Sequence, residues 1–185
     1  MEGSVQFGRR ELGLDLEASD FLNGHLQRGS YDVVTMWATL EHLADPSSFV
    51  AEAARVLRPG GLLALSVPNT RSLSHLILRQ RDRYLCVEHL NYFTQDTMSQ
   101  LLRRHGYIIR RAITRKINPK TVVQDLLSNP EVERMPSELL SDQVATDRVK
   151  TARMLAPVRF GHRVLERGLA ATGLGDLLLI LAQRP

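Results

Sequence analysis

The strongest constraint on the fold is the segment Tyr31–Asn69, in which two apolar runs flank a helical pattern. The runs Tyr31–Trp37 and Leu62–Val67 consist largely of apolar and β-branched residues, which is typical of strands buried on both faces of a parallel sheet. Between them, Asp45-Pro46 combines an N-cap residue with proline at the first helical position. Arg58–Gly61 then ends the helix and turns the chain. The segment therefore predicts a strand–helix–strand unit with a right-handed crossover.

The rest of the chain continues this alternation, which predicts a doubly wound α/β sheet. The other predicted strands are Leu14–Ala18, Tyr107–Thr114 and Leu177–Ala182. We expect Tyr31–Trp37 to lie beside Leu62–Val67, and Leu177–Ala182 to run antiparallel to its neighbours. The predicted helices are residues 4–12, residues 72–79, the segment that Thr94 caps and Gly106 ends, and most of residues 119–172. We expect a single partial domain, in which residues 1–117 form the core strands and helices, 118–172 a helical insertion or cover, and 173–185 the final strand.

Composition favours a globular protein. A hydrophobic content of 43% over 185 residues is sufficient for the core of one domain. The single cysteine, Cys86, excludes an internal disulfide and a cysteine-based metal cluster, and it is consistent with a reducing cytoplasm. The first residues lack the apolar region of a signal peptide, and the longest apolar run, Leu177–Ala182, is too short to cross a bilayer. We therefore expect a cytoplasmic protein that has no membrane partner.

Nucleic acid is not an expected partner, because the net charge of +4 is mild and spread along the chain. The densest basic cluster consists of Arg103, Arg104, Arg110, Arg111, Arg115 and Lys116. Such a cluster can contact phosphates, but no aromatic platform accompanies it. We interpret it as a solvated surface near a helix end and a strand.

Four further motifs occur in a specific order. They are Asp20-Phe21 after a short strand, Leu40–Leu43 after Tyr31–Trp37, Val56–Gly61 before the next strand, and Glu88–Thr94 before a helix that ends in His105–Tyr107. In this order and spacing, the chain resembles the class I S-adenosylmethionine-dependent methyltransferases of the type 11/12/23-like group. The resemblance covers about Phe7–Arg115 and Leu177–Pro185. It implies a Rossmann-like sheet and S-adenosyl-L-methionine as the cofactor.

The resemblance also implies where the cofactor binds. Ligands of open α/β sheets bind beyond the carboxyl ends of the strands. Asp20 follows such an end and can accept a hydrogen bond from an adenine amino group, although an exposed loop aspartate is the simpler alternative. Trp37 is placed against the cofactor, with burial in the core as its alternative. The implied cofactor-binding residues are Asp20, Phe21, Trp37, Ala38, Thr39 and His42.

The acceptor pocket is implied to involve Glu41, Tyr84 and Tyr92. His89 is the candidate general base for a hydroxyl acceptor, with a histidine packed in a loop as the alternative. For Glu41 and His42 the alternative is a hydrogen-bonding pair at a helix start. We expect no metal, because Ala38 occupies the position that could supply a further carboxylate.

Two parts of the family pattern are absent from the sequence. The resemblance implies an initial strand with a G-x-G-x-G turn, and a second strand that ends in an acidic residue. The one G-x-G here, Gly173–Gly175, follows a predicted helix near the C-terminus and cannot fill that place. We therefore expect an N-terminally truncated domain, in which Met1 falls just past the second strand. In the family the two absent strands lie in the middle of the sheet, between Leu14–Ala18 and Tyr31–Trp37.

The predicted function is methyl transfer from S-adenosyl-L-methionine to an oxygen, nitrogen or carbon atom of a small-molecule acceptor, with catalysis largely by positioning. We expect this activity to be impaired in the chain alone. The alternative is a non-catalytic remnant that acts as an interaction module or partner subunit. An orphaned apolar strand edge also predicts self-association through Val33, Val34 and Met36.

Overall fold

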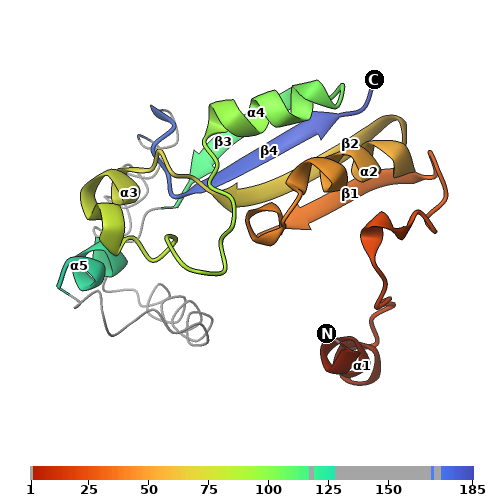
Figure 1. Ribbon diagram of the computed structural model, residues 1–185, viewed down its shortest axis with the longest axis horizontal. Coiled ribbons are helices and arrows are strands. Elements are labelled where there is room, and N and C mark those ends of the chain that lie inside the picture. The colour runs from red at the N-terminus through yellow and green to blue at the C-terminus, as the bar shows by residue number, and fades with distance from the viewer. Residues whose placement is uncertain (1, 117–118, 128–167, 169–171) are drawn as a thin grey trace, which may run out of the picture.

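The computed structural model describes residues 2–116, 119–127, 168 and 172–185. Its strands form one mixed sheet in the order β1-β2-β4-β3 (Figure 1). The strands are β1 (Tyr31–Trp37), β2 (Leu57–Pro68), β3 (Ile108–Arg115) and β4 (Leu177–Gln183). The α-helices are α1 (Glu2–Leu12), α2 (Pro46–Val56), α3 (Leu73–Leu78), α4 (Gln95–Arg104) and α5 (Pro119–Leu127). Short 3₁₀ helices are η1 (Phe21–Asn23), η2 (Leu40–His42) and η3 (Arg79–Arg81).

The sheet confirms the predicted α/β class and the predicted strand neighbours. β1 runs parallel to β2, with Val33 opposite Leu62, and α2 connects the two strands. β4 lies between β2 and β3 and is antiparallel to both, as predicted. The chain therefore returns through the sheet interior on β4 after β3 has formed one edge.

Local sequence signals account for most helix ends. The carboxylate of Asp45 accepts hydrogen bonds from the backbone amides of Ser47 and Ser48, at 3.0 and 3.2 Å. Thr94 and Thr97 form a capping box at the start of α4. Because these side chains satisfy amides that have no partner within the helix, α2 and α4 begin where the sequence predicts.

The segment Arg58–Gly61 differs from its predicted role as a turn. α2 ends at Val56 as expected, but β2 begins directly at Leu57. The pairing with β1 is irregular here, because Tyr31 lies opposite Leu57 whereas Val33 lies opposite Leu62. A Cβ on Gly61 would approach the carbonyl oxygen of Arg58 to 2.9 Å, so the absent side chain permits this tight bulge.

The hydrophobic core lies between one face of the sheet and the helices α2 and α4. In Figure 1, α2 lies along β1 and β2, and α4 lies along β3 and β4. Alternate residues of β2 and β4 face this core, as expected for strands with one covered face. The fully buried members include Val50, Ala53, Leu63, Leu65, Val67, Met98, Leu102, Leu178 and Ala182.

The expectation that β1 is buried on both faces is wrong. Its residues Tyr31, Val33 and Trp37 are 40, 50 and 56% exposed, whereas Met36 is buried and Val34 is half-buried against the core. The reason is that β1 is an edge strand, hydrogen-bonded to β2 on one side. Since side chains alternate along a strand, the exposed residues point away from the face that α2 covers. Of the three residues predicted for self-association, Val33 alone is therefore exposed.

The predicted strand Leu14–Ala18 is also wrong. These residues form no regular element, and the segment folds back on α1 instead. The backbone amide of Leu14 donates to the carbonyl of Gly8 at 3.1 Å, and Arg9 donates to the carbonyl of Leu16 at 2.6 Å. A strand needs a neighbouring strand for its hydrogen bonds, and the sheet of the described residues offers none at this place.

The remaining predictions concern the C-terminal third. α5 agrees with the predicted helical character of residues 119–127, but the rest of the predicted helical insertion lies outside the described residues. The proposed division into 1–117, 118–172 and 173–185 remains a prediction. Within the described part of the chain, every helix is too short or too polar to cross a bilayer.

Candidate functional site

The structure brings three of the predicted site residues together beyond the carboxyl end of β1. Glu41 and His42 lie on η2, which begins three residues after the last residue of β1, and His89 lies on the loop that precedes α4. One ligand atom from each of these side chains lies within 4.8 Å of the other two. The two imidazole rings meet edge to face, with their centroids 4.7 Å apart. We call Glu41, His42 and His89 the histidine cluster.

Backbone hydrogen bonds hold the two halves of the histidine cluster together. The amides of Leu90 and Asn91 donate to the carbonyl of Glu41, at 2.8 and 3.0 Å. The side-chain amide of Asn91 donates to the carbonyls of Leu40 and Leu43, at 3.2 and 2.6 Å. Sequence reasoning assigned no role to Asn91, although it lies within the motif Glu88–Thr94. Its contacts fasten the loop of His89 onto η2.

Both imidazoles of the histidine cluster donate through the same nitrogen. His42 Nδ1 lies 3.0 Å from the carbonyl oxygen of Glu88, and His89 Nδ1 lies 2.8 Å from the carbonyl oxygen of Tyr84. A carbonyl oxygen can only accept, so each Nδ1 carries the proton of the hydrogen bond. In the neutral rings, each Nε2 therefore presents a lone pair that can take a proton or bind a metal ion.

Glu41 is the buried member of the histidine cluster. Glu41 is 1% exposed, and its Oε2 has no hydrogen-bond partner among the residues that the structure describes. Burial raises the pKa of Glu41, and the positive charges that His42 and His89 can carry lower it. A buried carboxylate oxygen without a partner is costly, so Glu41 is suited to a cation or proton donor that the described residues do not supply.

Trp37, the last residue of β1, and Ala38 directly after it form an exposed rim. Trp37 is more than half exposed, so the alternative that it belongs to the core is wrong. Ala38 has a left-handed backbone with φ of 48°, which is unusual for a residue with a side chain. Its amide donates to the carbonyl of Ser66 at 3.0 Å, and the hydroxyl of Thr39 donates to the carbonyl of Trp37 at 3.1 Å. The sharp turn leads the chain from β1 directly into η2.

Asp20 and Phe21 are not joined to the histidine cluster. The carboxylate of Asp20 accepts from the amide of Leu22 at 3.0 Å and so caps η1. The ring of Phe21 lies 5.7 Å from the ring of Phe49, which places η1 against α2. Asp20 is exposed, as a ligand-binding residue or a simple loop aspartate would be, so the two interpretations of it remain open.

The two predicted tyrosines differ in environment. The ring of Tyr84 stacks on His89 with centroids 6.4 Å apart. Burial raises the pKa of Tyr84 to about 12, and the charges of Asp176 and Asp82 contribute. Its hydroxyl is therefore protonated at neutral pH and can donate a hydrogen bond. Tyr92 is 45% exposed, and its hydroxyl donates to the carbonyl of Cys86 at 3.3 Å.

Two buried aspartates near Tyr84, Asp82 and Asp176, were not predicted from the sequence. Asp82 is 4% exposed and bonds the Nδ1 of His75 at 2.9 Å. Asp176 is also buried, and within the described part of the chain its Oδ1 lacks a hydrogen-bond partner. Burial raises the pKa of Asp176, and the charge of Asp82 raises it further. These residues lie far apart in the sequence, so no local pattern could have identified them.

We expect the substitution Asp176→Asn to stabilise the protein at neutral pH. The folded-state pKa of Asp176 lies above its ordinary value of 3.8, so its favourable contribution is complete below that value. The contribution is lost as the pH rises through the raised pKa. An uncharged amide avoids this loss, so the gain in melting temperature over the wild type should be largest near pH 7 and shrink toward pH 4. Thermal melts across this range check it, with the exposed Asp15→Asn as a control. A variant that is less stable than the wild type at pH 7 would contradict it.

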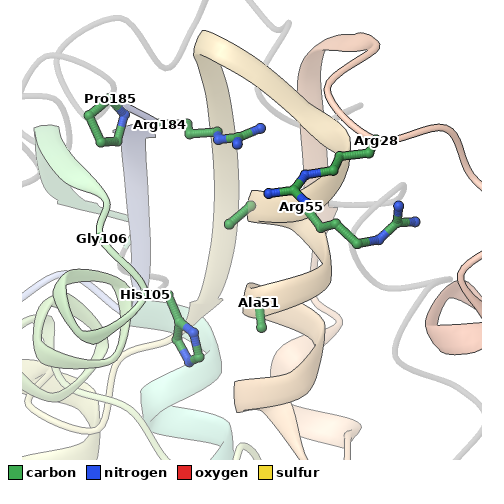
Figure 2. Close-up of a pocket in the computed structure, with 8 residues that line it drawn as sticks. Arg28, Ala51, Arg55, His105, Gly106, Arg184 and Pro185 are labelled. Carbon is green, nitrogen blue, oxygen red and sulfur yellow. The ribbon is translucent and has the colours of Figure 1, made fainter.

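A separate pocket of about 490 Å³ lies away from these residues. Figure 2 shows its side chains; it is lined by Arg28, Ala51, Ala54, Arg55, His105, Gly106, Arg184 and Pro185. Arg55 is engaged by Glu52 at 2.7 Å and by the carbonyl of Leu26. Arg184 donates to the carbonyl of Leu57. Two of the three arginines that line the pocket thus have their guanidinium groups in structural contacts. No predicted site residue lines this pocket.

The family profile and two of the curated relatives that match this chain are described as methyltransferases. A family profile described as a methyltransferase domain matches residues 9–111, which is more than half of the chain. The ubiquinone biosynthesis O-methyltransferase of Thiobacillus denitrificans is 27% identical over 124 residues, which cover 63% of this chain and 53% of that protein. A probable S-adenosylmethionine-dependent methyltransferase of Mycolicibacterium smegmatis is 32% identical over 116 residues, covering 54% of this chain and 44% of that protein. The chain thus spans about half the length of these curated relatives.

Solved structures share the fold. A methyltransferase from Thermotoga maritima, described as a possible histamine N-methyltransferase, superposes with a TM-score of 0.58 at 15% identity, covering 95% of this chain and 66% of that one. A methyltransferase from Archaeoglobus fulgidus gives a TM-score of 0.58 at 16% identity, covering 99% and 72%. At such identities the likeness concerns the fold alone. The sheet described above is therefore the Rossmann-like sheet of these proteins in part.

Proposed function

Because the chain belongs to the methyltransferase domain family, as its sequence resemblance predicted, we propose that it transfers a methyl group from S-adenosyl-L-methionine to a hydroxyl oxygen of a small molecule. The observation that carries this proposal is the free Nε2 of His89 beside the carboxyl end of β1. The name of one relative, an O-methyltransferase of ubiquinone biosynthesis, supports an oxygen atom as the acceptor.

The residues around the end of β1 suit the cofactor. Trp37 is a large aromatic residue held exposed at the place where ligands of α/β sheets bind, and it offers a face for stacking. Ala38, which forms the tight turn after Trp37, has only a methyl side chain and so adds little bulk beside the exposed ring of Trp37. Asp20 can receive the adenine amino group through its exposed carboxylate while it caps η1. S-adenosyl-L-methionine, when bound, supplies an electrophilic methyl group and leaves as a neutral thioether.

The histidine cluster acts on the acceptor in this proposal. The acceptor hydroxyl gives its proton to Nε2 of His89 as its oxygen forms the new bond to the methyl carbon. The Nδ1–H bond to Tyr84 keeps the ring in the tautomer that can accept this proton. The carboxylate of Glu41 stabilises the imidazolium that results. Tyr84 and Tyr92 complete the acceptor pocket, where the protonated hydroxyl of Tyr84 orients the acceptor by hydrogen bonding.

The alternative, a non-catalytic partner subunit, also has an observation in its favour. The edge strand β1 exposes Tyr31, Val33 and Trp37, and an exposed apolar edge is suited to pairing with another chain. In that case the residues at the end of β1 would meet a partner protein rather than a cofactor.

Methyl transfer at millimolar labelled cofactor to a set of ortho-dihydroxybenzenes tests the two functions. We expect a methylated phenol with the wild-type chain, and a turnover that is lower by about 10²–10⁴-fold in His89→Gln, because a general base is lost. The matched control is His105→Gln, whose imidazole bonds Ser47 outside the site at 2.8 Å. Turnover of His89→Gln at the wild-type rate would refute the role of His89. Absence of any methylated product would favour the partner subunit.

A further inference from the structure

We propose that the pocket beside the last turns of α2 binds the phosphate group of a small phosphorylated molecule. The pocket has a volume of about 490 Å³. Small-molecule sites commonly measure about 300–1,000 Å³. Figure 2 shows Arg184, Pro185 and Gly106 on one side of the pocket, and Arg28 and Arg55 on the other. We call this space the arginine pocket.

The arginine pocket lies at the end of the sheet opposite the histidine cluster. Arg28 precedes β1, Gly106 precedes β3, and Arg184 follows β4, which runs antiparallel to β2 and β3. The histidine cluster lies beyond the other end of β1. The arginine pocket is therefore a second site, and binding there does not depend on the proposed methyl transfer.

Unbalanced positive charge is the first observation that points to an anion. The described residues that line the pocket include three arginines and no aspartate or glutamate. Arg55 is balanced by Glu52, whose carboxylate accepts from Nε at 2.8 Å and from Nη2 at 2.7 Å. Arg28 and Arg184 form no ion pair with any described side chain. A phosphate monoester carries about two negative charges at neutral pH and can balance both of them.

Unused N–H donors are the second observation. A guanidinium group carries five N–H donors in a planar fork, which matches the oxygens of a phosphate. Arg184 uses Nη1 to donate to the carbonyl of Leu57, so its Nε and Nη2 are left without a partner among the described residues. The side chain of Arg28 likewise bonds no residue in the part of the chain that the structure describes. Both arginines can therefore donate to one phosphate group.

The backbone of both arginines is held in place. The amide of Gly29 donates to the carbonyl of Arg55 at 3.0 Å, which fastens the loop of Arg28 to the end of α2. The amide of Arg184 donates to the carbonyl of Gly61 at 2.9 Å, which fastens the end of β4 to β2. Because the backbone is fixed, a ligand orders only the two side chains, and this keeps the entropic cost of binding small.

Small side chains leave room for the rest of the ligand. α2 presents Ala51 and Ala54 to the pocket, and a Cβ on Gly106 would meet no other atom within 4 Å. The two methyl groups and the ring of Pro185 offer apolar contacts. The pocket is larger than inorganic phosphate requires, so we expect a phosphate ester, such as a sugar phosphate, to bind more tightly than phosphate itself.

Calorimetric titration of the full chain with ribose 5-phosphate tests the site. We expect saturable one-to-one binding, competition by inorganic phosphate, and no binding of ribose. Arg28→Gln and Arg184→Gln should each weaken binding by about tenfold or more, because each removes hydrogen bonds between charged groups. Arg28→Lys keeps the charge but loses the planar fork, so its affinity should lie between those of the wild type and Arg28→Gln.

Two kinds of control separate the pocket from the rest of the basic surface. Arg104→Gln removes an exposed charge at the same end of the molecule from a residue that does not line the pocket, and it should bind like the wild type. Ala51→Glu places a carboxylate in the pocket and should abolish binding. Ala51→Gln has nearly the same size and should weaken binding less, because the charge is absent. Glutamate and glutamine are both good helix formers, so α2 is retained.

Absence of saturable ribose 5-phosphate binding by the wild type would overturn the proposal, as would unchanged affinity in Arg28→Gln. Arg28 is exposed, so its substitution leaves the core intact even if Arg184→Gln fails to fold. Equal losses in Arg28→Gln and Arg104→Gln would also overturn it, because they would show diffuse attraction of phosphates to the basic surface. An RNA oligonucleotide that binds more tightly than ribose 5-phosphate, and depends equally on both arginines, would assign this surface to nucleic acid instead.

Discussion

The 185-residue chain is expected to bind S-adenosyl-L-methionine only at millimolar concentration. The sequence has no glycine-rich turn placed after a strand, so the amino-acid and ribose parts of the cofactor lack the backbone and carboxylate partners that the family resemblance implies. Each lost hydrogen bond costs about 0.5–1.5 kcal/mol, and those to charged groups about 1.5–3 kcal/mol. A loss of about 4 kcal/mol moves a micromolar dissociation constant to millimolar. Calorimetry at micromolar cofactor should therefore show no saturable heat.

A complementation experiment separates weak binding from a damaged site. A strand–glycine-turn–strand segment from a relative, fused ahead of Met1 or added as a separate chain, should restore micromolar affinity. In the restored protein, Asp20→Ala should weaken binding again. Asp20→Asn is the matched control, because its side-chain oxygen can still accept the hydrogen bond of Leu22 and cap η1. Micromolar binding by the 185 residues alone would mean that some other part of this chain supplies the missing contacts.

The same chain is expected to self-associate through β1. The strand forms one edge of the sheet of the described residues, so its outward backbone groups can pair with a second copy. Tyr31, Val33 and Trp37 add exposed apolar surface on the face opposite α2. We expect dimers or larger species at micromolar concentration, and a shift to monomer in Val33→Lys, because a charge on an edge strand opposes pairing. Sedimentation velocity or light scattering measures the change.

The control for this experiment is Val87→Lys. Val87 is 83% exposed and lies on the loop before α4, so the same change of charge and size is made away from the sheet edge. Its oligomeric state should match that of the wild type. A wild-type chain that sediments as a cooperatively melting monomer would contradict the prediction and would show that the edge of β1 is covered.

Sequence reasoning succeeded where the signal is local. The strand–helix–strand unit at Tyr31–Val67 and the caps at Asp45 and Thr94 were predicted. The caps depend on residues within one turn of chain, and the strands on uninterrupted apolar runs. The antiparallel last strand was predicted from the order of the elements. The family resemblance also rests on such short motifs and is confirmed by the profile match to residues 9–111.

Sequence reasoning failed where the outcome depends on neighbours. Leu14–Ala18 has a strand-like pattern but no adjacent strand in the described sheet, so it folds back on α1. The apolar run of β1 predicts burial on both faces, but an edge strand with one covered face leaves half of its side chains exposed. An apolar pattern indicates that a segment prefers to be buried. Whether a neighbouring strand or helix is there to cover it cannot be read from the same segment.

The strand–helix–strand order around α2, the caps that begin α2 and α4, and the residue types near the carboxyl end of β1 follow from the sequence alone, because backbone preferences and caps act over a few residues. The meeting of Glu41, His42 and His89, the Nδ1 hydrogen bonds that leave Nε2 of both histidines free to accept, and the burial of Oε2 of Glu41 without a partner among the described residues are properties of the tertiary structure. These properties arise from hydrogen bonds between η2 and the loop of residues 84–91, two segments that are separated along the chain and joined through Asn91. Contacts of this kind are set by the packing of the whole sheet, and no local pattern contains them.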